Sequence, residues 1–271
     1  MGRVIVIAEA GVNHNGSIDL AKQLVDIAFN AGADYVKFQT FKAESLVTQS
    51  AKQAPYQSRN IGREESQFEM LKKLELSNDM HDEIIKYCGL KGIKFLSTGF
   101  DISSVKYLQD KVDLFKVPSG ELTNLPLIKM MTSLKKPMIL STGMASMEEV
   151  RFIVDEIKKA QKSFTPSQVE GLPPLTVLHC TTAYPAPFES VNLRAMNTMN
   201  KELGVDIGYS DHTLGIEVPI AAVAMGATII EKHFTISRDL EGPDHAASLE
   251  PNELHSMVRS IRNIDTKRRI I

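Results

Sequence analysis

Short runs of apolar and β-branched residues recur along the chain and are separated by stretches with helical spacing. The runs are expected to form strands at residues 4–8, 35–38, 94–97, 114–117, 138–141, 176–179, 206–209 and 228–233. Between them, apolar residues three or four positions apart predict helices, for example at residues 18–30, 147–158, 193–203 and 251–264. Ser17 and Ser146 stand at the N-cap positions of two of these helices. The pattern is a strand followed by a helix, repeated.

Apolar strands that alternate with amphipathic helices are typical of parallel sheets. Eight such units in about 250 residues is the content of a closed (β/α)8 barrel. We therefore predict an α/β fold, a TIM barrel, formed as a single domain by residues 1–271. A doubly wound sheet is the alternative, but it normally has fewer strands and often a glycine-rich phosphate turn. Neither G-x-G-x-x-G nor a Walker A loop occurs in the sequence.

One connection is longer than the others. Residues 40–67, which follow the second predicted strand, are polar and include Pro55. Connections of this length in compact domains usually carry function, so we expect a functional loop here.

Composition narrows the possible partners. A net charge of -2 gives no overall attraction to nucleic acid or to an anionic membrane, so a local site must hold any anion. No apolar run has the length of a membrane span. The chain has only two cysteines and no recognisable leader at its N-terminus, and we expect it to work in the cytoplasm.

Polar residues stand at or just beyond nearly every predicted strand. In TIM barrels the carboxyl ends of the strands and the loops after them build the active site. We therefore expect these residues to ring a polar pocket. The set comprises Glu9, Asn13, His14, Asn15, Lys37, Gln39, Ser97, Thr98, Lys116, Ser119, Glu121, Ser141, Thr142, Thr181, Thr182, Tyr184, Ser210, Asp211, His212, Glu231, Lys232 and His233.

Two lysines in this set indicate an anion site. Lys37 and Lys116 lie on strands separated by one other, and they would share the pocket with the hydroxyls of Thr98, Ser119 and Ser141. These donors suit a phosphate or a carboxylate. Each lysine could instead be a buried stem paired with a nearby acid. A Schiff-base lysine, as in a class I aldolase, is the other functional alternative.

Two histidines suggest a metal site. His212 and His233 end the seventh and eighth strands, close enough to bind one divalent ion. Glu9 or Glu121 could add a direct or water-mediated oxygen ligand. The spacing is not a metal motif, and histidines at strand ends can also be structural.

The other histidines and Cys180 have less specific positions. We expect His179 and Cys180 to pack in the barrel or support it, with a soft metal ligand as the alternative for Cys180. His81 and His255 fall on predicted outer helices and are expected to face solvent. For His14 a site role and a loop-stabilising role stay open.

A turn follows the eighth strand at residues 241–245, EGPDH. We expect it to overhang the mouth of the barrel, where Asp244 could accept hydrogen bonds from the hydroxyls of a polyol.

Six motifs, taken together, resemble the sialic acid synthase family, which includes synthases for N-acetylneuraminic, legionaminic and pseudaminic acids and a spore-coat polysaccharide relative. They are IAEAGVNHNG at 7–16, VKFQ at 36–39, KVPSGE at 116–121, HCTTAYP at 179–185, YSDHT at 209–213 and EKHFT at 231–235. The match spans the chain and keeps the motif order. The resemblance implies condensation of phosphoenolpyruvate with an N-acetylated mannose-type sugar, which yields a nine-carbon 3-deoxy-ulosonic acid and phosphate.

The resemblance also implies roles for individual residues. Lys37, Thr98, Lys116, Ser119 and Ser141, joined by Tyr184, would hold phosphoenolpyruvate. His212 and His233 would bind a divalent metal, Mn2+ above all, with Mg2+ or Co2+ possible. Glu121 would order a metal-bound water, and Glu9 and Asp244 would contact the open-chain sugar. For Glu9 a structural pairing with a lysine is the alternative.

Three departures from the family pattern qualify these roles. Thr182 stands where some members have Asn, which affects a hydrogen bond to phosphate or sugar, and Gly99 stands where some have Pro. Family members typically continue into a small antifreeze-like domain that reaches across a homodimer, and this sequence ends before it. We therefore expect binding of phosphoenolpyruvate and metal but slow turnover in this form.

The sequence leaves two questions open. A barrel kept only as an anion-binding module is a third reading, beside the synthase and the Schiff-base aldolase. The acceptor is also undecided between N-acetylmannosamine and 2,4-diacetamido 6-deoxy sugars. Residues 50–67, with Tyr56, Gln57 and Asn60, are expected to cover the sugar and to decide that choice.

Overall fold

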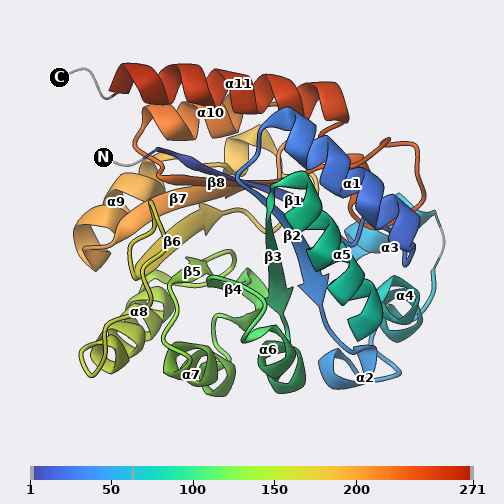
Figure 1. The fold of residues 1–271 in the computed structure, drawn as a ribbon, viewed down its shortest axis with the longest axis horizontal. Helices are drawn as coiled ribbons and strands as arrows, with labels where there is room; N and C mark the ends of the chain where they lie inside the picture. Colours follow the sequence, from blue (N-terminus) through green and yellow to red (C-terminus); the bar gives the residue numbers. More distant parts are fainter. Residues whose placement is uncertain (1–2, 63, 269–271) are drawn as a thin grey trace.

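Eight parallel strands form the centre of the computed structural model, which describes residues 3–62 and 64–268 (Figure 1). The strands are β1 (Ile5–Gly11), β2 (Tyr35–Thr40), β3 (Lys94–Gly99), β4 (Phe115–Val117), β5 (Met138–Ser141), β6 (Leu175–Cys180), β7 (Asp206–Asp211) and β8 (Ile229–His233). Their hydrogen-bonded order is β3-β2-β1-β8-β7-β6-β5-β4. β3 and β4, the two ends of this order, are in contact, so the strands form a nearly closed TIM barrel.

Helices surround the barrel, as the alternating pattern predicts (Figure 1). They are α1 (Ile18–Ala31), α2 (Ala43–Leu46), α3 (Pro55–Ile61), α4 (Gln67–Leu74), α5 (Asn78–Lys91), α6 (Ile102–Leu108), α7 (Leu125–Ser133), α8 (Met147–Gln161), α9 (Arg194–Leu203), α10 (Glu217–Ala224) and α11 (Pro251–Arg268). Ser17 and Ser146 cap α1 and α8 through their side chains, as predicted. None of these helices, within the described residues, is long and apolar enough to cross a bilayer.

The predicted barrel is confirmed, and the doubly wound alternative is wrong. β1 pairs with both β2 and β8, which joins the two ends of the chain into one sheet. β1 also runs three residues further than predicted, to Gly11, so Glu9 lies inside the strand rather than after it. The pairing with β2 shifts register between Glu9 and Gly11.

The segment 40–67 is not the irregular loop that the sequence suggested. It contains α2 and α3, and α4 begins at its end. Pro55 occupies the first turn of α3, the Ala54 N–H donates to Gln57 Oε1 at 2.9 Å, and Ser66 caps α4. These local caps stabilise short helices that periodicity alone does not reveal, because each has too few turns to show a repeat.

His81 on α5 is fully buried, so its predicted exposure is wrong, whereas His255 on α11 is exposed as expected. The His81 ring bonds to Thr40 Oγ1 at 2.9 Å and to the Ser77 carbonyl at 3.0 Å. Burial lowers the pKa of His81, so the neutral ring is the stable form. His81 therefore packs α5 against the end of β2, and both of its ring nitrogens have hydrogen-bond partners.

Alternation along the strands decides which polar groups enter the barrel. On β8, Glu231 and His233 point inward and Lys232 points outward, where its side chain is fully buried between barrel and helices. Lys232 forms an ion pair with Asp211 of β7 and bonds to the Thr213 carbonyl. Asp211 also accepts hydrogen bonds from Thr213. This ion pair links β7 to β8 on the outer face of the barrel, opposite the side chains that point inward.

Replacing Lys232 tests how much this ion pair stabilises the fold. Lys232→Met leaves the buried Asp211 charge without its cation, so we expect the free energy of unfolding to fall by about 3–5 kcal/mol. Lys111→Met is the matched control, because Lys111 pairs with the exposed Asp82 and such pairs contribute less than about 1 kcal/mol. Urea denaturation followed by circular dichroism measures both, and equal losses in the two variants would contradict the account.

Candidate active site

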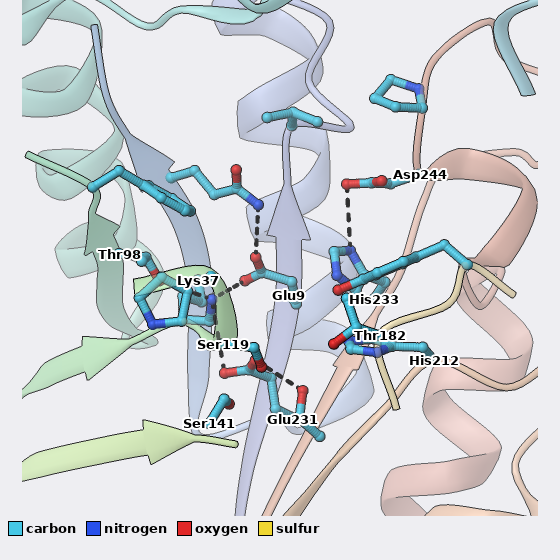
Figure 2. A pocket seen from close by; sticks show the side chains of 18 of the residues that line it. Glu9, Lys37, Thr98, Ser119, Ser141, Thr182, His212, Glu231, His233 and Asp244 are labelled. Carbon is cyan, nitrogen blue, oxygen red and sulfur yellow. Dashed lines mark hydrogen bonds and ion pairs between the residues drawn. The ribbon is translucent and has the colours of Figure 1, made fainter. Parts of the chain in front are cut away.

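The polar strand ends meet in one cavity of about 230 Å³ at the carboxyl end of the barrel. Eleven of the twelve predicted site residues line it: Glu9, Lys37, Thr98, Lys116, Ser119, Ser141, Thr182, Tyr184, His212, His233 and Asp244. Glu121 is the exception. Figure 2 shows these side chains converging from strands that are far apart in the sequence.

Two lysines and two carboxylates form the floor of the cavity. Lys37 Nζ lies 2.8 Å from Glu9 Oε2 and 3.7 Å from Glu231 Oε2, and it donates to Thr98 Oγ1 at 3.1 Å. Lys116 Nζ lies 3.2 Å from Glu231 Oε1. All four charged side chains are buried. We call them the charged floor; Figure 2 shows the Lys37 amine next to the carboxylates of Glu9 and Glu231.

Glu231 is the residue that sequence reasoning missed. It was counted among the polar strand ends but given no role, although it stands two residues before His233 on the same strand and therefore shares its face. This two-residue spacing is the sequence feature that could have assigned Glu231 to the cavity. Glu231 Oε1 also accepts from Ser210 Oγ at 3.1 Å, so one carboxylate contacts groups from three other strands.

Burial and neighbouring charges shift the pKa values of the charged floor in opposite directions. Burial alone raises the pKa of Glu231, but Lys116 and Lys37 lower it to about 2, which keeps it ionised. Burial lowers the pKa of Lys37, and Glu231 and Glu9 more than offset this, so its pKa is raised. The pKa of Lys116 is lowered, chiefly by burial. Burial raises the pKa of Glu9 to about 7 despite the adjacent Lys37.

Hydroxyl groups line the side of the cavity next to Lys116. Ser141 Oγ is buried and, among the described residues, has no hydrogen-bond partner, so it is free to donate to a ligand. Ser119 Oγ contacts Cys180 Sγ at 3.1 Å, and the Gly143 N–H donates to the same sulfur at 3.2 Å. Cys180 therefore supports the site from behind, as the packing interpretation predicted.

The two histidines face the cavity beside one another (Figure 2). Their ring centroids lie 5.7 Å apart at an angle of 55°. His212 Nδ1 lies 2.7 Å from the Thr181 carbonyl, which can only accept, so Nδ1 carries the proton and Nε2 keeps a lone pair. Burial lowers the pKa of both rings, that of His233 well below its usual value, which leaves both neutral.

This donor set fits a divalent metal with two protein ligands. His233 Nδ1 is buried and finds no hydrogen-bond partner in the described part of the chain; its nearest acidic atom is Asp244 Oδ2 at 3.9 Å. An unpaired buried nitrogen is costly unless something binds it. No group of three His, Cys, Asp or Glu side chains suited to a metal occurs among residues 3–62 and 64–268. The remaining ligands would come from water or substrate.

α3 covers the opening of the cavity. Tyr56 stacks on Tyr184 with ring centroids 5.2 Å apart, and Tyr184 in turn packs on His212 at 4.2 Å. Asn60 Nδ2 donates to the Pro243 carbonyl at 2.7 Å, which ties α3 to the loop after β8. Tyr56 and Gln57 line the cavity, so part of segment 50–67 lies over the pocket.

Comparison with known proteins agrees with this geometry. The sequence model of the NeuB family matches residues 24–269, most of the chain. The chain belongs to the NeuB family. The resemblance inferred from the six motifs is thereby confirmed.

Individual NeuB relatives match over nearly the whole chain. The chain is 48% identical to a protein of Campylobacter jejuni named N,N'-diacetyllegionaminic acid synthase, over 97% of this chain and 77% of that protein. A protein of the same name from Legionella pneumophila is also 48% identical, over 96% and 72%. The crystal structure of the N-acetylneuraminic acid synthetase of Leptospira borgpetersenii superimposes with a TM-score of 0.84 at 32% identity, covering 99% of this chain and 86% of that one.

Glu121, predicted as a site residue, and His14, for which a site role was left open, do not line the cavity. Glu121 sits on the 3-10 turn Ser119–Glu121, where its Oε2 accepts from Asn124 Nδ2 at 2.7 Å, while Asn124 caps α7. This capping network explains why Glu121 does not line the pocket. His14 lies in the loop after β1, and its Nδ1 accepts from the Gly16 N–H at 3.0 Å, so the loop-stabilising role has a contact in the structure.

Gly143 tests the hydroxyl side of this NeuB site. Its φ is +38°, and a Cβ there would lie 2.4 Å from Ser119 Cβ and 2.6 Å from Thr182 Oγ1. Gly143→Ala should therefore displace both side chains and weaken binding of inorganic phosphate about tenfold, the effect of losing one charge-assisted contact. Gly92→Ala is the control, since Gly92 also has a positive φ, does not line the cavity, and a Cβ there meets nothing within 4 Å. Isothermal titration calorimetry measures both, and an unchanged affinity in Gly143→Ala would contradict the hydroxyl contacts.

Proposed function

We propose that this protein joins phosphoenolpyruvate to an N-acetylated mannose-type amino sugar, with a divalent metal such as Mn2+, to give a nine-carbon 3-deoxy-ulosonic acid and phosphate. The observation that carries the proposal is the convergence of two buried lysines and two neutral histidines in one cavity. The names of its relatives support a synthase of sialic-type acids.

The charged floor and the hydroxyl side would bind phosphoenolpyruvate. Lys37 and Lys116 carry the charge that an enol phosphate with a carboxylate requires, and Thr98, Ser119 and Ser141 add neutral donors. Glu231 contacts both amines and Glu9 contacts Lys37, so the two ammonium groups are held in position before the substrate arrives. The fixed donors would hold phosphoenolpyruvate in one position beside the histidine side of the cavity.

The histidine side would hold the sugar in its open-chain form. A divalent ion bound by His212 and His233 would act there as a Lewis acid on the aldehyde. Asp244, which is buried beside His233, and Glu9 would contact hydroxyls of the sugar. Tyr184 packs against His212 and, with Tyr56 above it, excludes water from this side.

The reaction balances with one water. C3 of phosphoenolpyruvate forms a bond to C1 of the sugar, whose aldehyde oxygen takes up a proton and becomes a hydroxyl. Water adds to C2 of the resulting cation, the C2–O bond to phosphate breaks, and C2 becomes a ketone. Glu9, with its pKa raised to about 7, can hold a proton at its carboxylate near neutral pH.

The direct test is release of phosphate from phosphoenolpyruvate. With Mn2+ and a panel of N-acetylmannosamine and 2,4-diacetamido 6-deoxy sugars, at least one sugar should give stoichiometric phosphate and ulosonic acid. Phosphate that fails to appear with every sugar, also in a longer chain that includes any C-terminal domain, would leave only an anion-binding barrel.

A Schiff-base aldolase is the second candidate, because Lys116 lies inside a barrel strand and its amine reaches the cavity, as a Schiff-base lysine requires. Under our proposal, borohydride added with pyruvate traps no adduct on Lys37 or Lys116, since both are held in ion pairs. Intact-mass spectrometry measures this, and a mass increase that disappears in Lys116→Met would favour the aldolase.

The metal site is tested by binding rather than by turnover. His212→Ala removes one of two nitrogen ligands, so affinity for Mn2+ should fall at least about a hundredfold. His255→Ala, on the exposed face of α11, is the control. Titration followed by electron paramagnetic resonance measures free Mn2+, and equal affinities in the two variants would remove the histidines from the metal site.

A further inference from the structure

The thiol of Cys180 lies directly behind the hydroxyl side of the cavity. Cys180 ends β6 and is 3% exposed, and it does not line the cavity itself. Its Sγ accepts a hydrogen bond from the Gly143 N–H at 3.2 Å and lies 3.1 Å from Ser119 Oγ, and Ser119 does line the cavity. From the end of β6, the thiol therefore links the segments that follow β4 and β5.

The backbone beside the thiol is held in place by β6. Thr142 donates to the Leu178 carbonyl from its N–H at 3.1 Å and from its hydroxyl at 3.2 Å. Gly143, the next residue, has a φ of +38°, and a Cβ there would lie 2.5 Å from Ser119 Oγ, so its backbone packs directly against the serine. The thiol thus lies between an N–H in a fixed position and the Ser119 hydroxyl.

An unpartnered hydroxyl on the same side of the cavity points to a ligand there. Ser141 is 2% exposed and lines the cavity, and its Oγ has no hydrogen-bond partner in the described part of the chain. A buried donor is costly unless something accepts from it. Because Lys116 adds a positive charge to this side, an oxyanion is the ligand that fits these donors.

The single proton of the Ser119 hydroxyl decides the direction of its hydrogen bond to Cys180. When Ser119 donates this proton to an oxyanion, its oxygen can still accept. The sulfur already accepts from Gly143, so the thiol proton is the one left for the contact between Cys180 and Ser119. The donors then follow one another from the Gly143 N–H through the thiol and the Ser119 hydroxyl to the anion, and each bond polarises the next.

On the basis of the anion site in the proposed function, we infer that Cys180 is a positioning residue, whose thiol donates to Ser119 Oγ and directs the Ser119 hydroxyl toward an oxygen of the bound anion. The inference gives a role in substrate binding to a side chain that does not line the cavity. Its consequence is that removing the thiol weakens anion binding only while Ser119 is present.

Inorganic phosphate is the probe, and isothermal titration calorimetry measures its affinity. Cys180→Ala removes the donor to Ser119, so we expect the affinity for phosphate to fall about fivefold, the effect of one hydrogen bond. Cys180→Ser keeps a group that both donates and accepts, and it should bind phosphate within about twofold of the wild type. A Cys180→Ser variant that binds as weakly as Cys180→Ala would overturn the donor role.

Cys88→Ala is the matched control variant. Cys88 is also buried, at 1% exposed, but it lies on α5 in the main core and does not line the cavity. It shares the cost of truncating a buried cysteine and should keep the wild-type affinity for phosphate. Equal losses in Cys88→Ala and Cys180→Ala would assign the effect to packing and overturn the inference.

A Ser119→Ala background separates positioning from a general structural effect. Since Cys180 acts through Ser119, adding Cys180→Ala to Ser119→Ala should change the affinity for phosphate by less than about twofold. A further loss of about fivefold in this background would mean that Cys180 acts on the site by another route, which contradicts the inference.

The outcomes also separate this inference from the proposed function. Phosphate that binds equally well to the wild type and to Cys180→Ala overturns the inference and leaves the condensation intact. A wild-type protein that binds neither phosphate nor phosphoenolpyruvate overturns both.

Discussion

Two ammonium groups buried in one cavity are the constraint on which the structure depends. Lys37 and Lys116 would repel each other and lose their hydration, and only carboxylates held at the same depth offset both costs. Glu231 contacts both amines and Glu9 contacts one. Glu9, Lys37 and Glu231 come from the neighbouring strands β1, β2 and β8, and the curvature of the barrel brings Lys116 of β4, at the end of the strand order, to the same place. The same curvature places the histidines of β7 and β8 on the adjoining side.

The two-residue repeat of the strands divides the polar residues into two systems. On β8, Glu231 and His233 serve the cavity, and Lys232 between them binds Asp211 on the outer side. On this strand, Lys232 thus holds β8 to β7, while Glu231 and His233 on either side of it in the sequence point into the cavity. This division explains why the carboxyl ends of the strands are polar on both faces and why the barrel tolerates so many charges at one end.

The sequence predicted the barrel because eight apolar strands and their helices are regular, local signals. It predicted most of the cavity because polar residues at strand ends must meet at one rim. The role of Glu231 was missed, although the two-residue period of a strand puts Glu231 and His233 on one face; the register of the sheet then shows that this face points inward. Glu121 does not line the cavity, because it lies on the turn after β4 and accepts a hydrogen bond from Asn124, the N-cap residue of α7.

The sequence carries the least information about α3 and α4, the short helices that lie over the cavity. α3 and α4 are held by caps, a tyrosine stack and an apolar cluster that join segments distant in the sequence. None of these contacts has a period that a pattern could reveal. Similarly, the burial of His81 depended on hydrogen bonds to Thr40 and Ser77 that make an outer helix polar on its inner side.

The central claim is that Lys37 and Lys116 form one anion site through their shared carboxylate. Calorimetric affinities for phosphoenolpyruvate of the wild type, Lys37→Met, Lys116→Met and the double variant measure it directly. Because both amines contact Glu231, the account predicts strong loss of affinity in each single variant and a coupling of at least about 1 kcal/mol between them. Losses that add within about 0.5 kcal/mol, or single variants that bind like the wild type, would contradict it.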